Sequence, residues 1–236
     1  MRKTKIICTI GPASANKKVL SEMFKAGMNV ARLNFSHGSH EEHQEKIDLI
    51  RAVREEMNLP VAIMLDTKGP EYRIKTFKEQ KAVVREGATF TFTVDDVEGD
   101  ETIVSVNYKD LVSELSIGDR ILVNNGLLVF EVKELEEKNV ICKVITGGVI
   151  SDRKSMNFPN HVLKGDYLSE QDKTDLLFGI RNDVDFVAAS FVSTKADIKA
   201  LRDFLDENGG SSIDIIAKIE NRSGVEHIDE ICEIAD

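Results

Sequence analysis

The chain has little of what marks secreted or membrane proteins. Its 236 residues include only three cysteines, Cys8, Cys142 and Cys232, which are far apart and odd in number. They form neither a disulfide framework nor the spacing of a metal site, so a reducing cytoplasm fits best. No apolar run is long enough to cross a bilayer. We expect no signal peptide, because the first apolar run is short and stops at Gly11 and Pro12.

An excess of positive charge is also missing. The formal net charge is −10, which argues against a dedicated nucleic-acid binder, although a local basic cleft stays possible. The chain has no solenoid-type repeat and no low-complexity stretch. With 42% hydrophobic and 31% charged residues, it has enough apolar material for a folded core of one or two domains.

Five apolar runs predict buried strands. Helical periods with capping residues separate most of them, which predicts parallel strands with helices packed on the sheet. The runs cover residues 5–10, 30–35, 61–65, 185–191 and 214–219.

The segment between the third and fourth runs is different. From about residue 70 to residue 165 the apolar residues alternate, and no strong helical stripe is present. Asn125 and Gly126 lie between two apolar runs, which is a strong hairpin signal. We therefore predict a small all-β barrel domain at 70–165, inserted between two parts of a larger α/β domain at 1–69 and 166–236.

Five β–α units fit either an open doubly wound sheet or part of a (β/α)8 TIM barrel. A glycine-rich phosphate loop is absent, which weighs against a nucleotide-binding doubly wound sheet. A complete barrel needs about 250 residues without insertions, so the sequence predicts an incomplete one, with about five of the eight units.

Polar residues gather where the predicted strands end. Arg32, Asn34 and Ser36 alternate in the second strand, so they point to one side of the sheet. Burying these groups without partners would cost roughly 1–3 kcal/mol each, so we expect this strand end to face a ligand. The other strand ends carry Asp66, Thr67, Ser190, Lys218 and Glu220. The barrel mouth is where these ends converge.

These residue types indicate metal-assisted chemistry on a phosphorylated or acidic substrate. Glu220 is a hard oxygen ligand suited to Mg²⁺ or Mn²⁺, and Lys218 can neutralise charge that develops on an oxygen. Arg32 and Arg73 can each fork onto two phosphate oxygens. A further set of four oxygens has only one charged member, which suits a monovalent cation. These oxygens belong to Asn34, Ser36, Asp66 and Thr67. Phosphoryl transfer or enolate chemistry would use such a set.

Simpler interpretations stay open at this point. Lys218 and Glu220 can form a structural ion pair at a strand end. Arg32 can simply pair with Asp66. His37, which precedes Gly38, can be only a turn residue.

Several stretches resemble the pyruvate kinase family, in the same order along the chain. They are TKIICTIGPAS at 4–14, GMNVARLNFSHG at 27–38, LDTKGPE with Arg73 at 65–73, and IDIIAKIENRSGV at 213–225. The resemblance covers essentially the whole chain. It implies a (β/α)8 barrel with a β-domain inserted after the third strand, followed by a C-terminal regulatory domain.

The resemblance also implies the reaction. Phosphoenolpyruvate transfers its phosphoryl group to ADP, giving pyruvate and ATP in the last step of glycolysis, with Mg²⁺ (or Mn²⁺) and K⁺ as cofactors. By this resemblance Lys218 is catalytic, Arg32 and Ser190 join Lys218 in binding substrate, and Glu220 binds the divalent metal. Asn34, Ser36, Asp66 and Thr67 would hold K⁺, and Glu71 matches the K⁺-dependent form of the family. His37, Arg73 and Lys154 match nucleotide contacts.

In this family a second metal-binding aspartate and the last barrel strands would follow Asp236, so we expect the chain to lack part of the active site. The resemblance further implies a lid movement of the β-domain, a cytoplasmic location and commonly a homotetramer, with no nucleic-acid or membrane partner. Two alternatives stay open. The chain is a non-catalytic fragment that needs a partner chain, or it is another metal-dependent barrel enzyme such as a lyase.

Overall fold

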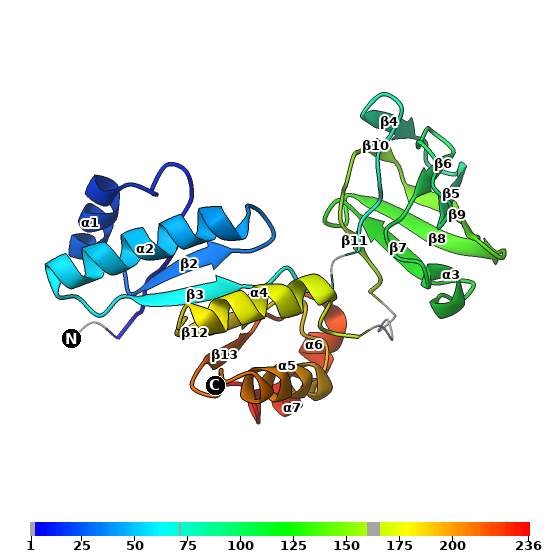
Figure 1. Ribbon diagram of the computed structural model, residues 1–236. Helices are drawn as coiled ribbons and strands as arrows, with labels where there is room; N and C mark the ends of the chain where they lie inside the picture. The colour runs from blue at the N-terminus through cyan, green and yellow to red at the C-terminus, as the bar shows by residue number, and fades with distance from the viewer. Residues whose placement is uncertain (1–2, 71, 160–165) are drawn as a thin grey trace. The chain divides into compact units, whose positions relative to one another are not determined.

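The computed structural model describes residues 3–70, 72–159 and 166–236. The chain divides into two compact units, which Figure 1 shows as a helix-rich part and a strand-rich part. The first unit comprises Met1–Pro70, Asp166–Glu220 and His227–Asp236, and the second comprises Glu71–Gly165 and Asn221–Glu226.

The first unit is built on a five-stranded sheet with the order β1-β2-β3-β12-β13. All its neighbouring strands run parallel, as the continuous apolar runs predicted. An α/β unit of this kind places all strand ends of one polarity along one edge of the sheet. The strands are Ile7–Thr9, Val30–Asn34, Ala62–Asp66, Phe186–Ala189 and Asp214–Ala217.

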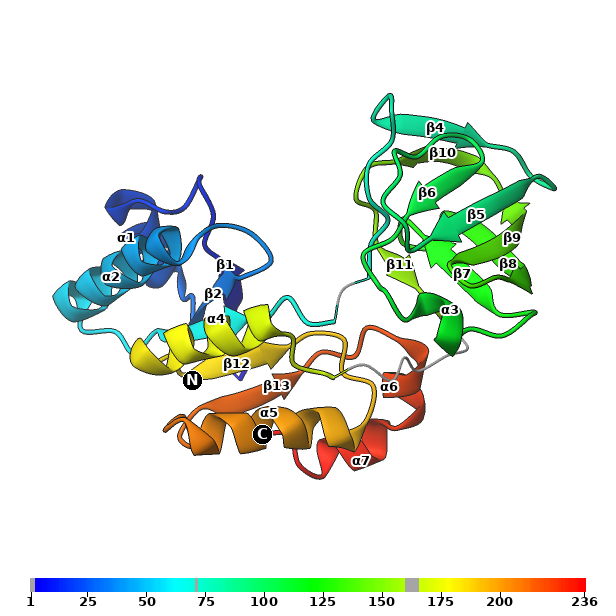
Figure 2. The same ribbon diagram turned by 45° about the vertical axis from the view of Figure 1, so that its right-hand side comes forward.

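Helices pack against one face of this sheet (Figures 1 and 2). The main core joins outward strand residues such as Leu33 and Leu65 to helix residues such as Ile47 and Leu201, all fully buried. Side-chain caps start several of the helices, with Asn16 as one cap and capping boxes at Ser39 and Ser169. The helices are α1 (Lys17–Ala26), α2 (His40–Met57), α4 (Glu170–Arg181), α5 (Lys195–Glu207) and α7 (Ile228–Cys232).

The opposite face of the sheet carries a different set of side chains. Because paired residues of neighbouring strands share a face, Val30, Met64 and Ala188 form a small separate apolar cluster there. The same face becomes polar toward the C-terminal ends of the strands. This polar end positions the residues that the sequence marked as functional.

The second unit consists mainly of antiparallel strands. A six-stranded sheet has the order β11-β7-β8-β9-β5-β6, and β10 pairs with β4 in a separate two-stranded sheet. The strands are β4 (Lys81–Val84), β5 (Thr89–Thr93), β6 (Ile103–Ser105), β7 (Arg120–Val123), β8 (Leu128–Leu135), β9 (Asn139–Thr146), β10 (Gly148–Ser151) and β11 (Met156–Asn157). The short helices α3 (Leu111–Glu114) and α6 (Arg222–Glu226) also belong to this unit.

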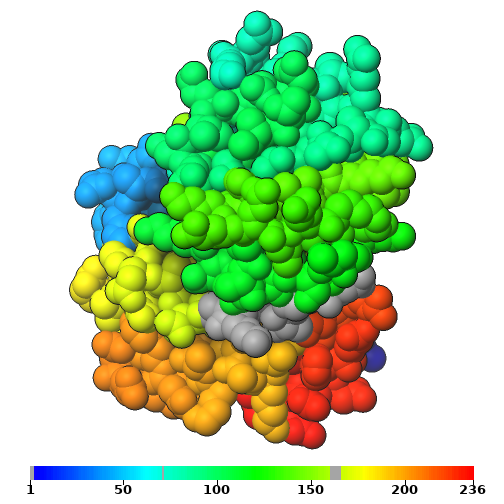
Figure 3. All heavy atoms as spheres, turned by 90° about the vertical axis from the view of Figure 1, so that its right-hand side faces the viewer, coloured from blue at the N-terminus to red at the C-terminus, as the bar shows by residue number. Residues whose placement is uncertain are grey.

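The aromatic core of this second unit explains why the alternating segments fold together. Phe90, Phe92 and Phe130 are fully buried, and their ring centroids lie 5.0–5.3 Å apart. The predicted hairpin is confirmed: β7 and β8 are antiparallel, and Asn125 and Gly126 have φ angles of 56° and 81° at the turn. In Figure 3 the teal residues of this unit lie at one end of it, beside the residues coloured green.

Within the described residues, no helix is both long enough and apolar enough to cross a membrane. The longest helix, α2, carries many charged side chains on its exposed face.

Candidate active site

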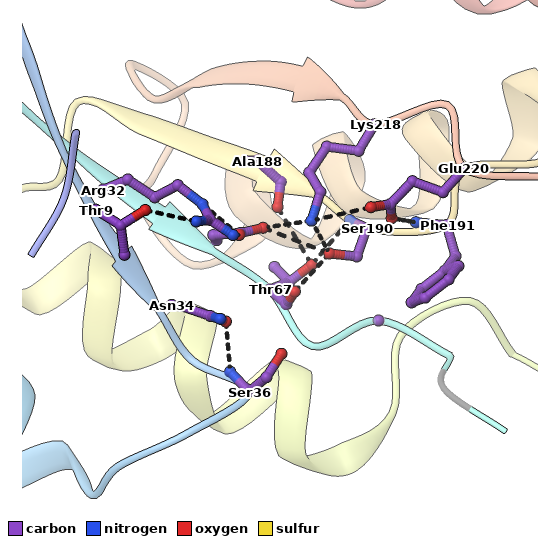
Figure 4. Close-up of polar contacts among 12 residues, drawn as sticks. Thr9, Arg32, Asn34, Ser36, Thr67, Ala188, Ser190, Phe191, Lys218 and Glu220 are labelled. Atoms are coloured by element: carbon purple, nitrogen blue, oxygen red, sulfur yellow. Dashed lines mark hydrogen bonds and ion pairs between the residues drawn. The ribbon is translucent and has the colours of Figure 1, made fainter. Parts of the chain in front are cut away.

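Six residues that the sequence singled out meet at the C-terminal ends of β2, β3, β12 and β13 (Figure 4). The parallel register brings them together, because Arg32 pairs with Met64, Asn34 with Asp66, and Asp66 with Ala188. The six are Arg32, Asp66, Thr67, Ser190, Lys218 and Glu220.

Asp66 is the centre of this group. Its side chain is 1% exposed, yet it faces two cations that are about a quarter to a third exposed. Arg32 donates to one carboxylate oxygen through Nε at 2.6 Å and also approaches it through Nη2, while Lys218 Nζ lies 2.8 Å from the other oxygen. The contact between Arg32 and Asp66 that we left open from the sequence is therefore present. Asp66 is one buried negative charge between two positive charges, and the Glu220 carboxylate, 3.6 Å from Lys218 Nζ, supplies a second negative charge.

A second set of hydrogen bonds fixes the position of Lys218. Its Nζ donates to Ser190 Oγ at 2.7 Å, and Ser190 Oγ donates to the Thr67 carbonyl oxygen at 2.6 Å. The Ser190 backbone N–H donates to Thr67 Oγ1 at 3.1 Å. Ser190 and Thr67 are both buried. The lysine ammonium is thus held by two oriented acceptors, a precondition for electrostatic stabilisation of a reacting group.

Glu220 lies at the edge of the group. Its Oε1 is 3.6 Å from Lys218 Nζ, a longer separation than that between Lys218 and Asp66. Its Oε2 accepts a hydrogen bond from the Phe191 N–H at 3.0 Å. Phe191 has a φ of 57°, a left-handed conformation that is a genuine outlier for a bulky residue. Backbone outliers of this kind cluster at functional sites.

Three further predicted residues lie at the end of β2 and in the loop that follows it: Asn34, Ser36 and His37. Asn34 Oδ1 accepts from the Ser36 N–H at 3.0 Å, which turns the chain at the strand end. The His37 side chain is exposed, and its backbone carbonyl accepts a 2.9 Å hydrogen bond from His43 Nε2. Asn34 lies in register with Asp66. A set of mostly neutral oxygens fits K⁺. Here such oxygens belong to the Asn34 amide, the Ser36 hydroxyl and the Thr67 carbonyl, and the Asp66 carboxylate adds the one charge.

A divalent metal has fewer ligands here. Within the described residues, no group of three His, Cys, Asp or Glu side chains is arranged to hold a metal ion. Glu220 offers a carboxylate near Lys218. This matches Mg²⁺ only in the mode in which one or two carboxylates and substrate phosphates complete the coordination.

The predicted nucleotide residues Arg73 and Lys154 belong to the second unit. Arg73 Nη1 donates to the Arg153 carbonyl oxygen, and the Ile74 N–H donates to the Lys154 carbonyl oxygen at 3.1 Å. Arg73 and Lys154 therefore lie on neighbouring chain segments of that unit. The prediction for Glu71 lies outside the described residues.

Two residues that contact the site were not predicted. Thr9 Oγ1 accepts from Arg32 Nη1 at 2.6 Å, and Thr9 pairs with Arg32 in the register of β1 with β2. The sequence signal that could have found Thr9 is its place near the end of the first apolar run, at 5–10. Tyr167 donates from its hydroxyl to the Ser190 carbonyl oxygen at 2.9 Å. No local pattern marks Tyr167, because its contact joins segments on either side of α4.

Comparisons with known proteins point to one family. The family model for the pyruvate kinase barrel domain matches residues 1–236. The chain is 47% identical to a pyruvate kinase of Clostridium perfringens and 44% identical to one of Clostridium acetobutylicum, and it is covered fully in both alignments. It is 42% identical to a pyruvate kinase of Staphylococcus haemolyticus.

The chain spans about half the length of these relatives: 50% of each clostridial protein and 41% of the staphylococcal one. The match nevertheless includes every strand of the parallel sheet and every described residue of the site. On this basis the chain belongs to the pyruvate kinase family.

Proposed function

We propose that this chain carries a pyruvate kinase site, which transfers the phosphoryl group of phosphoenolpyruvate to ADP and yields pyruvate and ATP. The observation that carries the proposal is the placement of Lys218 between the buried Asp66 and Ser190, with Arg32 on the same carboxylate. The relatives named pyruvate kinase support the choice of reaction.

Arg32 and Lys218 are two fixed positive charges, which suit the negative charge that develops in this reaction. Arg32 reaches the opening with its side chain 32% exposed, so its guanidinium can contact the phosphoryl oxygens. Lys218 stabilises negative charge on the transferring phosphoryl group and on the enolate oxygen that the departing group leaves behind. Asp66 and Ser190 keep its ammonium oriented, so little reorganisation is needed during the reaction.

The cofactors follow from the same residues. Glu220 would hold Mg²⁺ or Mn²⁺ together with substrate oxygens, and Asn34, Ser36, Asp66 and Thr67 would hold K⁺. The divalent ion would neutralise negative charge on the phosphoryl oxygens. His37, Arg73 and Lys154 would contact the nucleotide, and the oligomeric partner would be further copies of this chain.

We also propose that the parallel sheet is part of a (β/α)8 barrel and that the second unit is an inserted lid domain. The residues 71–165 that form most of this unit lie between β3 and β12 in the sequence, which supports an insertion after the third strand. A closing lid would exclude water, which otherwise hydrolyses the phosphate.

A second candidate is a pyruvate-kinase-like fragment that is inactive until a partner chain completes it. It is favoured by the chain's coverage of about half of its relatives. Both candidates use the same Lys218 geometry, so they differ only in whether the chain acts alone.

A coupled assay tests the proposal. It follows pyruvate formation from phosphoenolpyruvate and ADP with Mg²⁺ and K⁺, for the chain alone and for the chain mixed with a downstream half of a relative. Lys218→Met should abolish activity wherever it is found. Lys195→Met, which removes an exposed partner of Glu233, is the matched control and should keep activity. Activity that survives Lys218→Met would contradict the proposed role of this lysine.

A further inference from the structure

The peptide group between Ser190 and Phe191 connects two side chains that are far apart in the sequence. Its carbonyl oxygen accepts the Tyr167 hydroxyl at 2.9 Å, and its N–H donates to Glu220 Oε2 at 3.0 Å. A peptide group is planar, and its C=O and N–H point in opposite directions. The two hydrogen bonds therefore fix one rigid plane from its two sides.

This plane is held in an unfavourable orientation. The φ of Phe191 is 57°, in the left-handed region that bulky L-residues avoid. Rotating the peptide by half a turn would move the φ of Phe191 from 57° into the negative range that L-residues prefer. It would also point the N–H away from Glu220 and turn the carbonyl oxygen toward that carboxylate. The observed orientation therefore depends on its hydrogen-bond partners.

Tyr167 is well placed to supply one of them. Its ring packs against the main core of the first unit, so the hydroxyl has few alternative positions. Burial raises the pKa of this hydroxyl well above its usual value, and nearby Asp197, Asp172 and Glu220 add to the effect, so it stays a donor at neutral pH.

Gly69 lies close to the same Ser190 carbonyl group. A Cβ on Gly69 would lie 2.8 Å from the Ser190 carbonyl oxygen, and the Gly69 N–H is anchored to Asp172 Oδ1 at 3.0 Å. The carbonyl thus has a close backbone neighbour in addition to its donor. The Tyr167 hydroxyl is the side-chain donor to this carbonyl, on the side of the peptide opposite Glu220.

We propose that Tyr167 is a positioning residue, which holds the Ser190–Phe191 peptide in its strained orientation and thereby aims the Glu220 carboxylate. The consequence for metal binding rests on the proposed function of Glu220. The consequence for the peptide itself does not depend on it.

The first test observes the peptide directly. Phenylalanine labelled with ¹⁵N reports all 11 Phe amides of the chain, and Phe191→Leu identifies the amide of residue 191. In Tyr167→Phe, exchange of this amide with solvent should accelerate about 2- to 10-fold, the range that corresponds to one net hydrogen bond.

Tyr108→Phe is the matched control, because it removes a 2.8 Å hydroxyl hydrogen bond to Glu114 in the second unit. It should leave the Phe191 amide unchanged. An unchanged Phe191 amide in Tyr167→Phe would overturn the proposal, whatever happens to metal binding.

The second test measures Mn²⁺ affinity from the free-ion signal in electron paramagnetic resonance. Tyr167→Phe should weaken binding about 2- to 10-fold relative to the parent chain. The weakening should shrink in a Phe191→Gly background, because glycine adopts a positive φ without strain. An equal weakening in both backgrounds would overturn the role of the strained peptide. If the parent chain does not bind Mn²⁺ without substrate, the site needs the substrate oxygens, and the amide experiment alone decides the role of Tyr167.

Discussion

Gly69 lies so close to Ser190 that a Cβ at position 69 would come within 2.9 Å of the Ser190 Cβ. Gly69 also has a φ of 67°, so an alanine there would be strained as well as crowded. Both residues follow strands that carry the candidate site, β3 and β12. The loop after β3 can approach the loop after β12 only because residue 69 has no side chain.

Gly69→Ala should therefore destabilise the first unit by more than the cost of placing an alanine at a positive φ. Gly209→Ala is the control, because Gly209 has a φ of 85° in the same unit with nothing within 4 Å of an added Cβ. The control should lose about 1–2 kcal/mol, the cost of a left-handed alanine. Urea unfolding of both variants isolates the steric contribution. Equal losses would contradict the close packing of Gly69 against Ser190.

Asp66→Asn should be strongly destabilising, because it leaves Arg32 and Lys218 close together without their buried anion. Removing one partner of a buried ion pair typically costs about 3–5 kcal/mol, and the partial exposure of both cations places this variant near the lower end. Urea unfolding measures the loss. Asp203→Asn, which removes the exposed partner of Lys199 in α5, should change stability by less than about 0.5 kcal/mol. A comparable loss in the two variants would contradict the central role of Asp66.

His43 should make the first unit less stable in mild acid. Its side chain is 2% exposed, and burial lowers its pKa. The Nε2 atom donates to the His37 carbonyl oxygen, and Nδ1 has no hydrogen-bond partner within the described residues. The unfolded chain therefore binds a proton more readily than the folded one, so stability falls as the pH drops below the ordinary histidine value of about 6.5.

Urea unfolding at about pH 7.5 and about pH 5.5, on either side of that ordinary value, measures this effect. His43→Gln keeps an N–H donor but cannot titrate, so its stability should differ less between the two conditions. His37→Gln removes an exposed imidazole from the adjacent loop and should keep the difference of the parent chain. A pH difference that is the same in His43→Gln and in the parent would contradict the assignment to His43.

The isolated chain should associate through the edge of its parallel sheet. The strand β1 lies at one end of the strand order, and Ile7 within it is 50% exposed. Exposed edges of this kind pair with other chains. Light scattering after gel filtration should detect species larger than a monomer, and Ile7→Lys should reduce them. Ile117→Lys changes an exposed isoleucine of the second unit and serves as the control. A monodisperse monomer with a sharp cooperative melt would contradict this prediction.

Much of the candidate site was predictable because strand geometry is local. Alternation along β2 predicted that Arg32 and Asn34 share a face, and the ends of the apolar runs marked Asp66, Ser190 and Lys218. The partners of these groups were only partly predictable: the sequence offered the pairing of Arg32 with Asp66 as one interpretation, but not that of Lys218 with Asp66. Lys218 is 152 residues from Asp66 in the sequence, yet it lies closer to Asp66 than to Glu220, its neighbour on the chain.

The sequence by itself determined the parallel sheet, its covering helices and the turn at Asn125, because these depend on periodicity, capping residues and backbone preferences within short segments. Only the tertiary structure decided that Asp66 binds both Arg32 and Lys218, and that Tyr167 and Glu220 hold the two sides of one peptide. A period indicates which face a side chain occupies. Which groups meet on that face depends on strand order and on loops joined through distant parts of the chain.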